Sequence, residues 1–356
     1  MKKFELLLKQ LFLRLLLFFV STKRSDKPVH ISSSTRIMFI RLNRIGDALV
    51  CTPLLKQVKD SLNPVIYLLA DKKNHFVFNN NPSVDHVVVF EKGLKGFREI
   101  LKYIRSENID VLVDLHDDVS TTVTYLTAFA HVSHKFALRK SNSLVYTKTI
   151  NKPDPSKVHV VDRILSLAGL LGFEPKHADA NICYYPEDKS YARADSFLNS
   201  KYRDRKFLAG VNISAGSEAR FWGVDNFKRL IKLLKESGID VLVMCTTRDL
   251  KHALQIADNN NDMIFYSPSF DVFSAMISRL DVLITPDTSV VHIASCFCIP
   301  VFGLYVKYNT EDMIWSPYRS YFDYVVTTEP ELEAITFEET AGKLRDFVQK
   351  IIPARS

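Results

Sequence analysis

The sequence lacks the motifs that mark several common classes of protein. Its five cysteines include no C-x-x-C pair and no Cys/His spacing of the zinc kind, which argues against a disulfide framework or structural zinc and indicates a reducing compartment. Neither G-x-G-x-x-G nor the Walker A pattern occurs, so the phosphate cradles of dinucleotide oxidoreductases and P-loop enzymes are missing. With 11 glycines and 14 prolines in 356 residues, the chain is neither collagen-like nor of low complexity.

The sequence also lacks a long uninterrupted apolar run. Between Phe4 and Val20, 13 of 17 residues are apolar, but Lys9, Gln10 and Arg14 interrupt them, which argues against a membrane-spanning helix. At about 100° per residue the leucines and phenylalanines share one face and the basic residues lie opposite. The pattern predicts an interfacial helix that attaches the chain to a membrane surface; a secretory signal and a helix packed on the body of the protein are the alternatives.

An excess of basic charge is missing from most of the chain. The formal net charge is +7, but residues 1–27 hold seven basic and two acidic side chains, so the other 329 residues carry only +2. A nucleic-acid partner is therefore not expected, because such proteins concentrate basic charge on the binding domain itself.

The length predicts two domains, each large enough to bury its own core. From Arg36 onward, short β-branched runs alternate with amphipathic stretches, which is typical of parallel sheets covered by helices on both faces. We expect a membrane-interacting helix and linker at 1–35 and two Rossmann-like domains at 36–180 and 181–356. Strands are expected at 36–40, 65–69, 86–90, 111–115, 207–213, 241–244, 263–266, 282–284 and 301–304. Helices are expected at 48–61, 94–106, 158–171, 226–237, 250–258, 272–279, 290–297 and 337–352.

The first segment that suggests chemistry follows the opening strand and reads R-L-N-R-I-G-D-A-L-V-C-T-P-L-L, from Arg41 to Leu55. Gly46 permits a backbone turn that other residues resist. Asp47 then stands at the start of a helix, where a carboxylate is a favourable cap. Two interpretations stay open: a plain helix cap, or a general base held at the carboxyl end of the strand.

Two further segments follow strands in the second half. Ser214, Gly216, Ser217 and Arg220 offer amides, hydroxyls and a guanidinium, which are suited to phosphate oxygens, although such loops are common. In the segment T-P-D-T-S-V-V-H, residues 285–292, the start of a helix offers free amides to an anion such as a pyrophosphate. A purely structural cap by Asp287 and Thr288, and a core position for His292, are the alternatives.

A last cluster reads D-L-H-D-D, residues 114–118. It invites interpretation as a metal site, but the strand is expected to end at Leu115, which separates Asp118 from the other two ligands. We prefer a loop that lines the interdomain cleft, and no metal.

Taken together, the three strand-end segments resemble those of the heptosyltransferase family of bacterial glycosyltransferases, over roughly residues 36–304. The first is similar to the family's isoleucine-glycine-aspartate turn and threonine-proline-leucine helix, the second to its glycine-containing loop followed by a basic residue and tryptophan. The third is similar to its aspartate-threonine-glycine helix start. Ser289 replaces that glycine, Gly223 replaces a usual proline, and Arg220 replaces a usual lysine.

The resemblance implies an α/β fold of the GT-B type, with two Rossmann-like doubly wound domains facing across a cleft and a C-terminal helix that returns to the first domain. It implies an inverting, metal-independent transfer of heptose from ADP-heptose to the lipopolysaccharide inner core, without a cofactor. Asp47 matches the catalytic base. Donor-side residues are Ser214, Gly216, Ser217, Arg220, Asp249, Asp287, Thr288, Ser289 and His292. Acceptor-side residues are Arg41, Asn43, Arg44, Gly46 and His116.

The expected partners are a nucleotide sugar, a lipid-linked core oligosaccharide and the inner-membrane surface, with the protein in the cytoplasm and peripherally attached to that membrane. Three alternatives remain: another nucleotide sugar used on a glycolipid, a non-catalytic nucleotide-binding member, and a sugar-nucleotide epimerase of the same fold.

Overall fold

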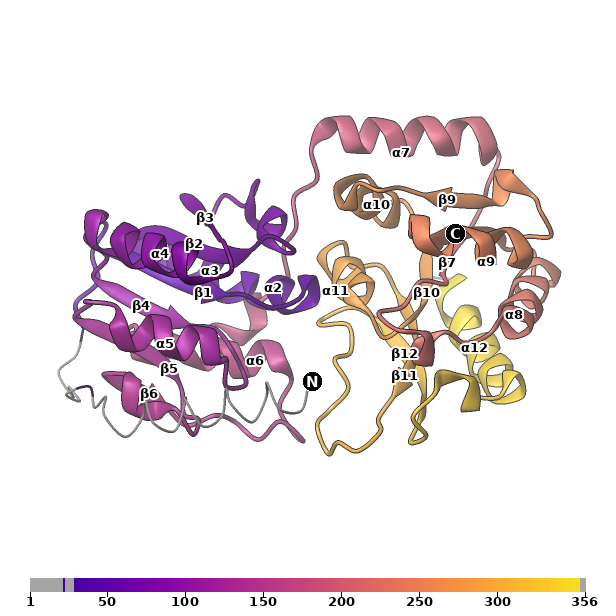
Figure 1. Ribbon diagram of the computed structural model, residues 1–356. Coiled ribbons are helices and arrows are strands. Elements are labelled where there is room, and N and C mark those ends of the chain that lie inside the picture. The colour runs from indigo at the N-terminus through magenta and orange to yellow at the C-terminus, as the bar shows by residue number, and fades with distance from the viewer. Residues whose placement is uncertain (1–21, 23–28, 353–356) are drawn as a thin grey trace. The chain divides into compact units, whose positions relative to one another are not determined.

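A computed structural model describes Thr22 and residues 29–352. The chain divides between Cys183 and Tyr184 into two compact units, each built around its own six-stranded sheet (Figure 1). The predicted N-terminal amphipathic helix lies outside the described residues. Among the residues that are described, no helix has the length and apolar content needed to cross a membrane.

The first sheet is entirely parallel, with strand order β3-β2-β1-β4-β5-β6. Its central strands are continuous apolar runs that are buried on both faces, because helices cover both sides. The strands are β1 (Arg36–Arg41), β2 (Val65–Asp71), β3 (His86–Phe90), β4 (Val111–Asp114), β5 (His134–Leu138) and β6 (Lys148–Ile150).

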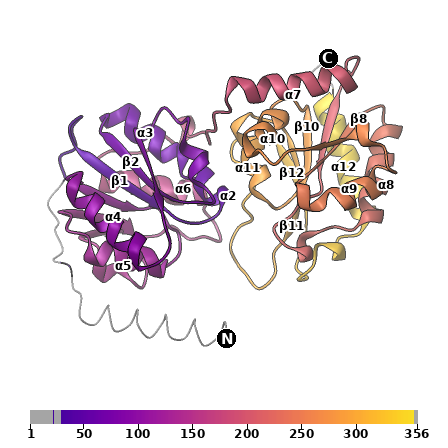
Figure 2. The same cartoon turned by 45° about the horizontal axis from the view of Figure 1, so that its top comes forward.

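Helices cover this sheet from both sides. On one face α4 and α5 lie side by side (Figure 2), and their buried residues pack against Met38, Ile40 and Leu112 of the strands. Helices α3 and α6 contact each other and belong to the other layer. The helices are α2 (Ile45–Leu49), α3 (Thr52–Leu62), α4 (Leu94–Ser106), α5 (Thr121–Phe129) and α6 (Val160–Leu165).

The second sheet repeats the same topology, with order β12-β11-β10-β7-β8-β9, again all parallel. When numbered from β7, this order is the 3-2-1-4-5-6 of the first sheet, which is the Rossmann order. The strands are β7 (Leu208–Asn212), β8 (Asp240–Cys245), β9 (Ile264–Tyr266), β10 (Val282–Pro286), β11 (Val301–Val306) and β12 (Phe322–Thr327).

The helices of the second unit also form two layers. Helices α8, α9 and α12 share one core with the sheet, whereas α10 contacts α7 and α11. The expectation that the C-terminal helix returns to the first domain is wrong: Leu344, Phe347 and Val348 of α12 pack inside the second unit's core. The helices are α7 (Asp188–Lys201), α8 (Val224–Glu236), α9 (Leu250–Ile256), α10 (Phe270–Ile277), α11 (Ser289–Cys296) and α12 (Phe337–Ile351).

Two expected helices are not continuous. The stretch 48–61 is divided between α2 and α3, because Pro53 lacks an N–H and is accommodated in the first turn of a new helix. The stretch 158–171 is α6 followed by a 3-10 helix, Ser166–Leu170. Strands β5, β6 and β12 and helices α5 and α7 are present although they were not predicted.

Candidate active site

The candidate site residues lie at the topological switch point of each sheet. In a doubly wound sheet the chain leaves the middle two strands in opposite directions, which opens a crevice at their carboxyl ends. In the first unit these strands are β1 and β4, and in the second they are β7 and β10. The segments at 41–47 and 114–116 follow the first pair, and those at 214–220 and 287–292 follow the second.

Asp47 is the third residue of α2, directly after β1, and its carboxylate is held by a buried guanidinium. Arg41 donates from Nη2 to Asp47 Oδ1 at 2.6 Å and from Nε to the Asp47 backbone oxygen at 3.0 Å. The side chain of Asp47 is 16% exposed, so the carboxylate is oriented but still reachable from solvent. Asn43 Nδ2 lies 3.5 Å from the same Oδ1.

This geometry argues against one of the two interpretations of Asp47. The cap position of α2 belongs to Arg44, and no side-chain hydrogen bond caps the helix. The carboxylate of Asp47 bonds to Arg41 instead of to backbone amides, so the plain helix cap is wrong. Gly46 is the second residue of α2 and has a helical backbone, so the expected turn at this glycine is also wrong.

Arg41 is fully buried, and its guanidinium is occupied. In addition to the two bonds to Asp47, Nη1 donates to the carbonyl oxygen of Leu115 at the end of β4. All three guanidinium nitrogens therefore bond to the protein, and Arg41 is not placed to contact an acceptor. Asn43 and Arg44 are exposed beside Asp47, in contrast, and stay candidates for acceptor contacts.

His116 belongs to a buried network centred on Asp114. Asp114 Oδ1 lies 2.6 Å from His116 Nδ1, and Oδ2 accepts from Lys140 Nζ at 2.8 Å and from Tyr146 Oη at 2.6 Å. The backbone N–H of Leu42 donates to His116 Nε2 at 3.2 Å, so Nδ1 carries the ring proton and points it at Asp114. His116 is therefore a support for the end of β1 and is not exposed to an acceptor.

The charges in this network shift pKa values in directions that keep it intact. Burial alone would raise the pKa of Asp114, but Lys140 and His116 outweigh it and hold that pKa well below its usual range. Burial lowers the pKa of His116, so its ring stays neutral. Burial and Asp114 raise the pKa of Tyr146, which keeps its proton as a donor.

The D-L-H-D-D segment does not form a cation site. Asp114 is saturated by its three partners, whereas the side chain of Asp118 is 95% exposed and points elsewhere. Asp117 makes two hydrogen bonds to the buried Arg163, at 3.2 and 2.8 Å. Across the described part of the chain, no group of three or more His, Cys, Asp or Glu residues converges as metal ligands would.

In the second unit, the carboxylate of Asp249 accepts hydrogen bonds from hydroxyls at the ends of β7 and β8. Its Oδ2 accepts from Ser214 Oγ at 2.5 Å and from Thr246 Oγ1 at 2.9 Å, and Oδ1 accepts from Arg248 Nε at 3.0 Å. Burial would raise the pKa of Asp249, but these bonds lower it, so the carboxylate is charged. The structure thus brings Ser214 and Asp249 together at the carboxyl ends of β7 and β8.

Arg220 and Asp287 form an ion pair between the β7 loop and the start of α11. Both side chains are partly exposed, so the pair is open to a ligand. Thr288 caps α11, its hydroxyl accepting from the Val290 N–H at 3.3 Å, and Ser289 is the first helical residue. The site thus combines a guanidinium with the amino end of an eight-residue helix, both of which favour negative charge.

The remaining donor-side residues have different surroundings. Gly216 and Ser217 are exposed in the β7 loop, whereas His292 is buried with its ring centroid 6.0 Å from that of Trp315. Gly223 has φ +91°, which proline cannot adopt, so the entry to α8 differs from one that contains the family's proline.

Sequence reasoning missed Arg248 and Lys140. Arg248 Nη2 donates to the Ala215 carbonyl oxygen at 2.7 Å, which ties the β8 loop to the β7 loop. Lys140 neutralises Asp114 from 26 residues away. The only available signal was weak: each is a basic residue close after an apolar run.

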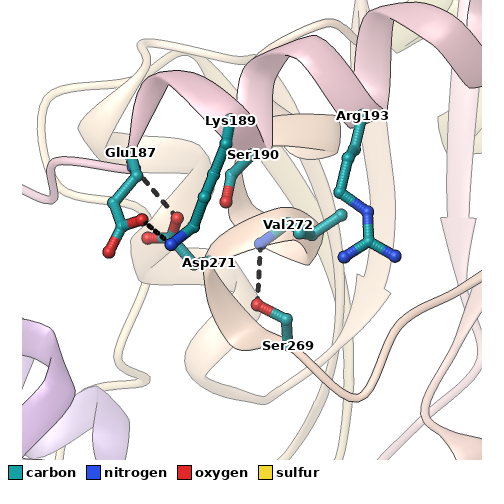
Figure 3. A pocket seen from close by; sticks show the side chains of 7 residues that line it. All are labelled: Glu187, Lys189, Ser190, Arg193, Ser269, Asp271 and Val272. Atoms are coloured by element: carbon teal, nitrogen blue, oxygen red, sulfur yellow. Dashed lines mark hydrogen bonds and ion pairs between the residues drawn. The ribbon is translucent and has the colours of Figure 1, made fainter.

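A hollow at the N-termini of α7 and α10 lies outside this site (Figure 3). Several of its polar groups bond to one another: the Glu187 N–H donates to Asp271 Oδ2 at 2.9 Å, Lys189 pairs with Glu187, and Ser269 caps α10. We assign no ligand to it.

Two Rossmann-like units in one chain, each with a six-stranded parallel sheet, are the architecture of the GT-B fold class. A family 9 glycosyltransferase structure from Veillonella parvula matches with a TM-score of 0.78 and 17% identity, covering 91% of this chain and 100% of that one. The E. coli heptosyltransferase WaaC, solved with ADP, matches with a TM-score of 0.68 and 16% identity, over 89% and 99%.

The chain belongs to glycosyltransferase family 9, the heptosyltransferases, whose family model matches residues 97–343. It is also 21% identical to the lipopolysaccharide core heptosyltransferase OpsX of Haemophilus influenzae, over 89% of this chain and 91% of that protein. The predicted family and fold class are thereby confirmed.

Proposed function

We propose that this glycosyltransferase moves heptose from ADP-heptose to the inner core of lipopolysaccharide, with inversion at the anomeric carbon and Asp47 as general base. The observation that carries the proposal is the clamped carboxylate: Asp47 is oriented by the buried Arg41 at the switch point of the first sheet, while one side stays open to solvent. A carboxylate held in this way is suited to take a proton from an attacking hydroxyl.

One proton and one electron pair are transferred in the proposed reaction. The acceptor oxygen gives its proton to Asp47 and forms a bond to the anomeric carbon, while the bond from that carbon to the β-phosphate oxygen breaks and ADP leaves with the electron pair. Attack from the face opposite the leaving group inverts the configuration.

We propose that the second unit binds the negatively charged phosphates of the donor. We assign these phosphates to Arg220, to the Gly216–Ser217 loop and to the amino end of α11 at Thr288 and Ser289, where positive potential is greatest. This arrangement supplies the counter-charge from the protein, which supports a metal-independent transfer. The charged carboxylate of Asp249 is suited to accept hydrogen bonds from the hydroxyls of the nucleotide.

We assign acceptor binding to the exposed residues beside Asp47. Asn43 and Arg44 lie on the loop between β1 and α2, and Arg44 offers five N–H donors to an anionic core sugar. Because the proposed acceptor is lipid-linked, we place the enzyme at the cytoplasmic surface of the inner membrane.

A mass-spectrometric transfer assay tests the proposal. ADP-heptose and a panel of truncated lipopolysaccharide acceptors are incubated with the protein, with and without EDTA. We expect the mass of one heptose residue to be added to one acceptor, with inverted configuration and at an unchanged rate in EDTA. Transfer of another sugar, or loss of activity in EDTA, contradicts the donor or the metal-independent mechanism respectively.

Arg41→Lys tests the clamp. A lysine keeps one positive charge but has no fork to reach Asp47 and Leu115 together. We expect kcat to fall about tenfold with an unchanged affinity for ADP. A reacting group displaced by a full ångström costs about 100-fold, and we expect Asp47 to shift by less than that. Steady-state kinetics and calorimetry measure the two quantities. An unchanged kcat contradicts the positioning role.

Arg220→Ala tests the donor site. The loss of charge-assisted hydrogen bonds to phosphate is expected to weaken ADP binding about 10- to 100-fold, as measured by calorimetry. Arg220→Lys keeps the charge and should bind within a few-fold of wild type. Arg229→Ala, at an exposed arginine paired with Glu338, is the matched control and should leave binding unchanged. Equal affinity in all three variants removes Arg220 from the phosphate site.

A further inference from the structure

Helix α4 carries an exposed surface that the proposed reaction does not use. Leu94, its first residue, is 79% exposed, and Phe129 at the end of the adjacent α5 is 48% exposed. The rings of Phe97 and Phe129 meet edge to face, with centroids 6.3 Å apart, so the apolar surface is continuous from one helix to the other. Both helices lie on the same face of the first sheet (Figure 2).

The basic residues of α4 lie together beside this apolar surface. At about 100° per residue, Leu94, Lys95, Arg98, Lys102 and Arg105 all fall within a sector of about 100°, on the side opposite to the buried Gly96, Ile100 and Ile104. We call Leu94, these four basic residues and Phe129 the α4 patch. Between Glu91 and Ser106 there are five basic and two acidic residues, although the chain after residue 27 is nearly neutral.

Helix α8 shows that basic residues without ion-pair partners are not a general property of the amphipathic helices in this protein. It has the same length and also four basic side chains, but three of them pair with carboxylates: Lys228 with Asp258, Arg229 with Glu338 and Lys232 with Glu236. On α4, Lys95 approaches Glu99 at 3.9 Å, and no other described residue forms an ion pair with Arg98, Lys102 or Arg105. Lys95 is thus paired in the same way as Lys232 of α8, and Arg98, Lys102 and Arg105 are left for an external partner.

The patch begins at the same edge of the sheet as the candidate base. All strands are parallel, so α4, which follows β3, starts at the carboxyl edge from which Asp47 projects. Lys92, just before α4, pairs with Asp71 at 3.2 Å, and Asn74 Nδ2 donates to the Arg41 carbonyl oxygen at 3.1 Å. The segment 71–74 thus joins the start of α4 to the end of β1.

We propose that the α4 patch is a docking surface for an anionic lipid bilayer. Its unpaired cations complement phosphate headgroups, and Leu94 and Phe129 are placed to enter the interface between headgroups and acyl chains. Docking by this face brings the carboxyl edge of the sheet to the membrane, where a lipid-linked acceptor is anchored. The inference rests on the proposed function only for the nature of that acceptor; the surface itself is argued from exposure and charge.

Vesicle binding of the full chain tests the proposal without any transfer reaction. Vesicles of phosphatidylcholine mixed with anionic phosphatidylglycerol are compared with pure phosphatidylcholine by co-sedimentation over a lipid titration. The variants are the quadruple change K95Q/R98Q/K102Q/R105Q and the single change Leu94→Ser. The matched control is K228Q/R229Q/K232Q/K235Q on α8, which removes the same number of charges.

We expect the α4 quadruple variant to need at least about tenfold more anionic lipid for half-binding, since each basic residue near an anionic surface contributes roughly fivefold and the loss of only two such contributions already exceeds tenfold. Leu94→Ser should weaken binding by a few-fold, and the α8 control should change it less than twofold. Each variant's thermal midpoint checks that it is folded. The N-terminal segment is intact in all of them, so its contribution is common.

Three results overturn the proposal. One is equal binding by wild type and the α4 quadruple variant. Another is an equal loss in the α8 control, which would show only an effect of net charge. The third is a change in molar mass by light scattering for Leu94→Ser with vesicle binding unchanged, which would assign the patch to a second copy of the chain. None of these results depends on whether heptose is the transferred sugar.

Discussion

Replacing Asp47 by asparagine is expected to lower kcat for heptose transfer by about 10²- to 10⁴-fold, the usual contribution of a general base. Asparagine has nearly the same shape and keeps an oxygen that accepts from Arg41, so the 2.6 Å contact can persist while the proton acceptor is lost. Donor binding is assigned to the second unit, so the KM for ADP-heptose should change little. Steady-state kinetics with the best acceptor from the transfer assay measure both constants.

Asp60→Asn is the matched control for this experiment. Asp60 lies on α3, its side chain is 59% exposed, and it pairs at 2.6 Å with Lys56, a surface lysine. The same chemical change at this position should leave kcat within twofold and the thermal midpoint unchanged. Retention of full activity by Asp47→Asn would remove the base from the mechanism. A loss of activity that merely follows a loss of folded protein would show a structural role.

Elements with a clear pattern of apolar residues could be predicted, including β3, of which only Phe90 is buried. β3 and α4 have the predicted bounds, since His86–Phe90 is a β-branched run and Leu94–Ser106 has strict helical periodicity. β5, in contrast, begins with His134 and Lys135 and lacks the signature of a buried strand. Helix α7 is mostly polar and buries only three residues, so its periodicity is weak.

The candidate site could be predicted as three separate segments but not as a geometry. The position of Asp47 after a strand was readable, whereas the burial of Arg41 was not, because an arginine at the end of a strand normally lies at the surface. It is buried here because Leu115, 74 residues later in the chain, offers a carbonyl oxygen to the guanidinium. Contacts at such separations follow from the β1–β4 pairing, which only the topology specifies.

Asp114→Asn is expected to destabilise the first unit by about 3–5 kcal/mol, the cost of breaking a buried ion pair while leaving its partner uncompensated. Asparagine cannot balance the charge of Lys140, whose side chain is almost completely buried. Asp118→Asn is the control: it makes the same change in the same segment at an exposed side chain and should shift stability by less than about 0.5 kcal/mol. Urea denaturation followed by circular dichroism measures the difference.

The pH dependence of stability distinguishes the lost charge from a mere packing defect. In the folded protein the pKa of Asp114 lies well below its unfolded value of about 4. Its contribution is therefore fully present above about pH 4 and is lost as the pH falls further, where the unfolded chain takes up a proton that the native state resists. Wild type should lose stability more steeply than Asp114→Asn over this range. Parallel pH profiles would contradict the charge argument.

The two tryptophans make the experiment specific to the first unit, because Trp222 and Trp315 both lie in the second. Their fluorescence should report an unchanged transition in Asp114→Asn, while circular dichroism shows an earlier one. The lost support also has a functional consequence, since His116 donates to Asp114 and accepts from Leu42, the residue after Arg41. Below its melting range the variant should therefore show a reduced kcat with normal ADP binding. A normal kcat in the folded variant would confine the Asp114 network to stability.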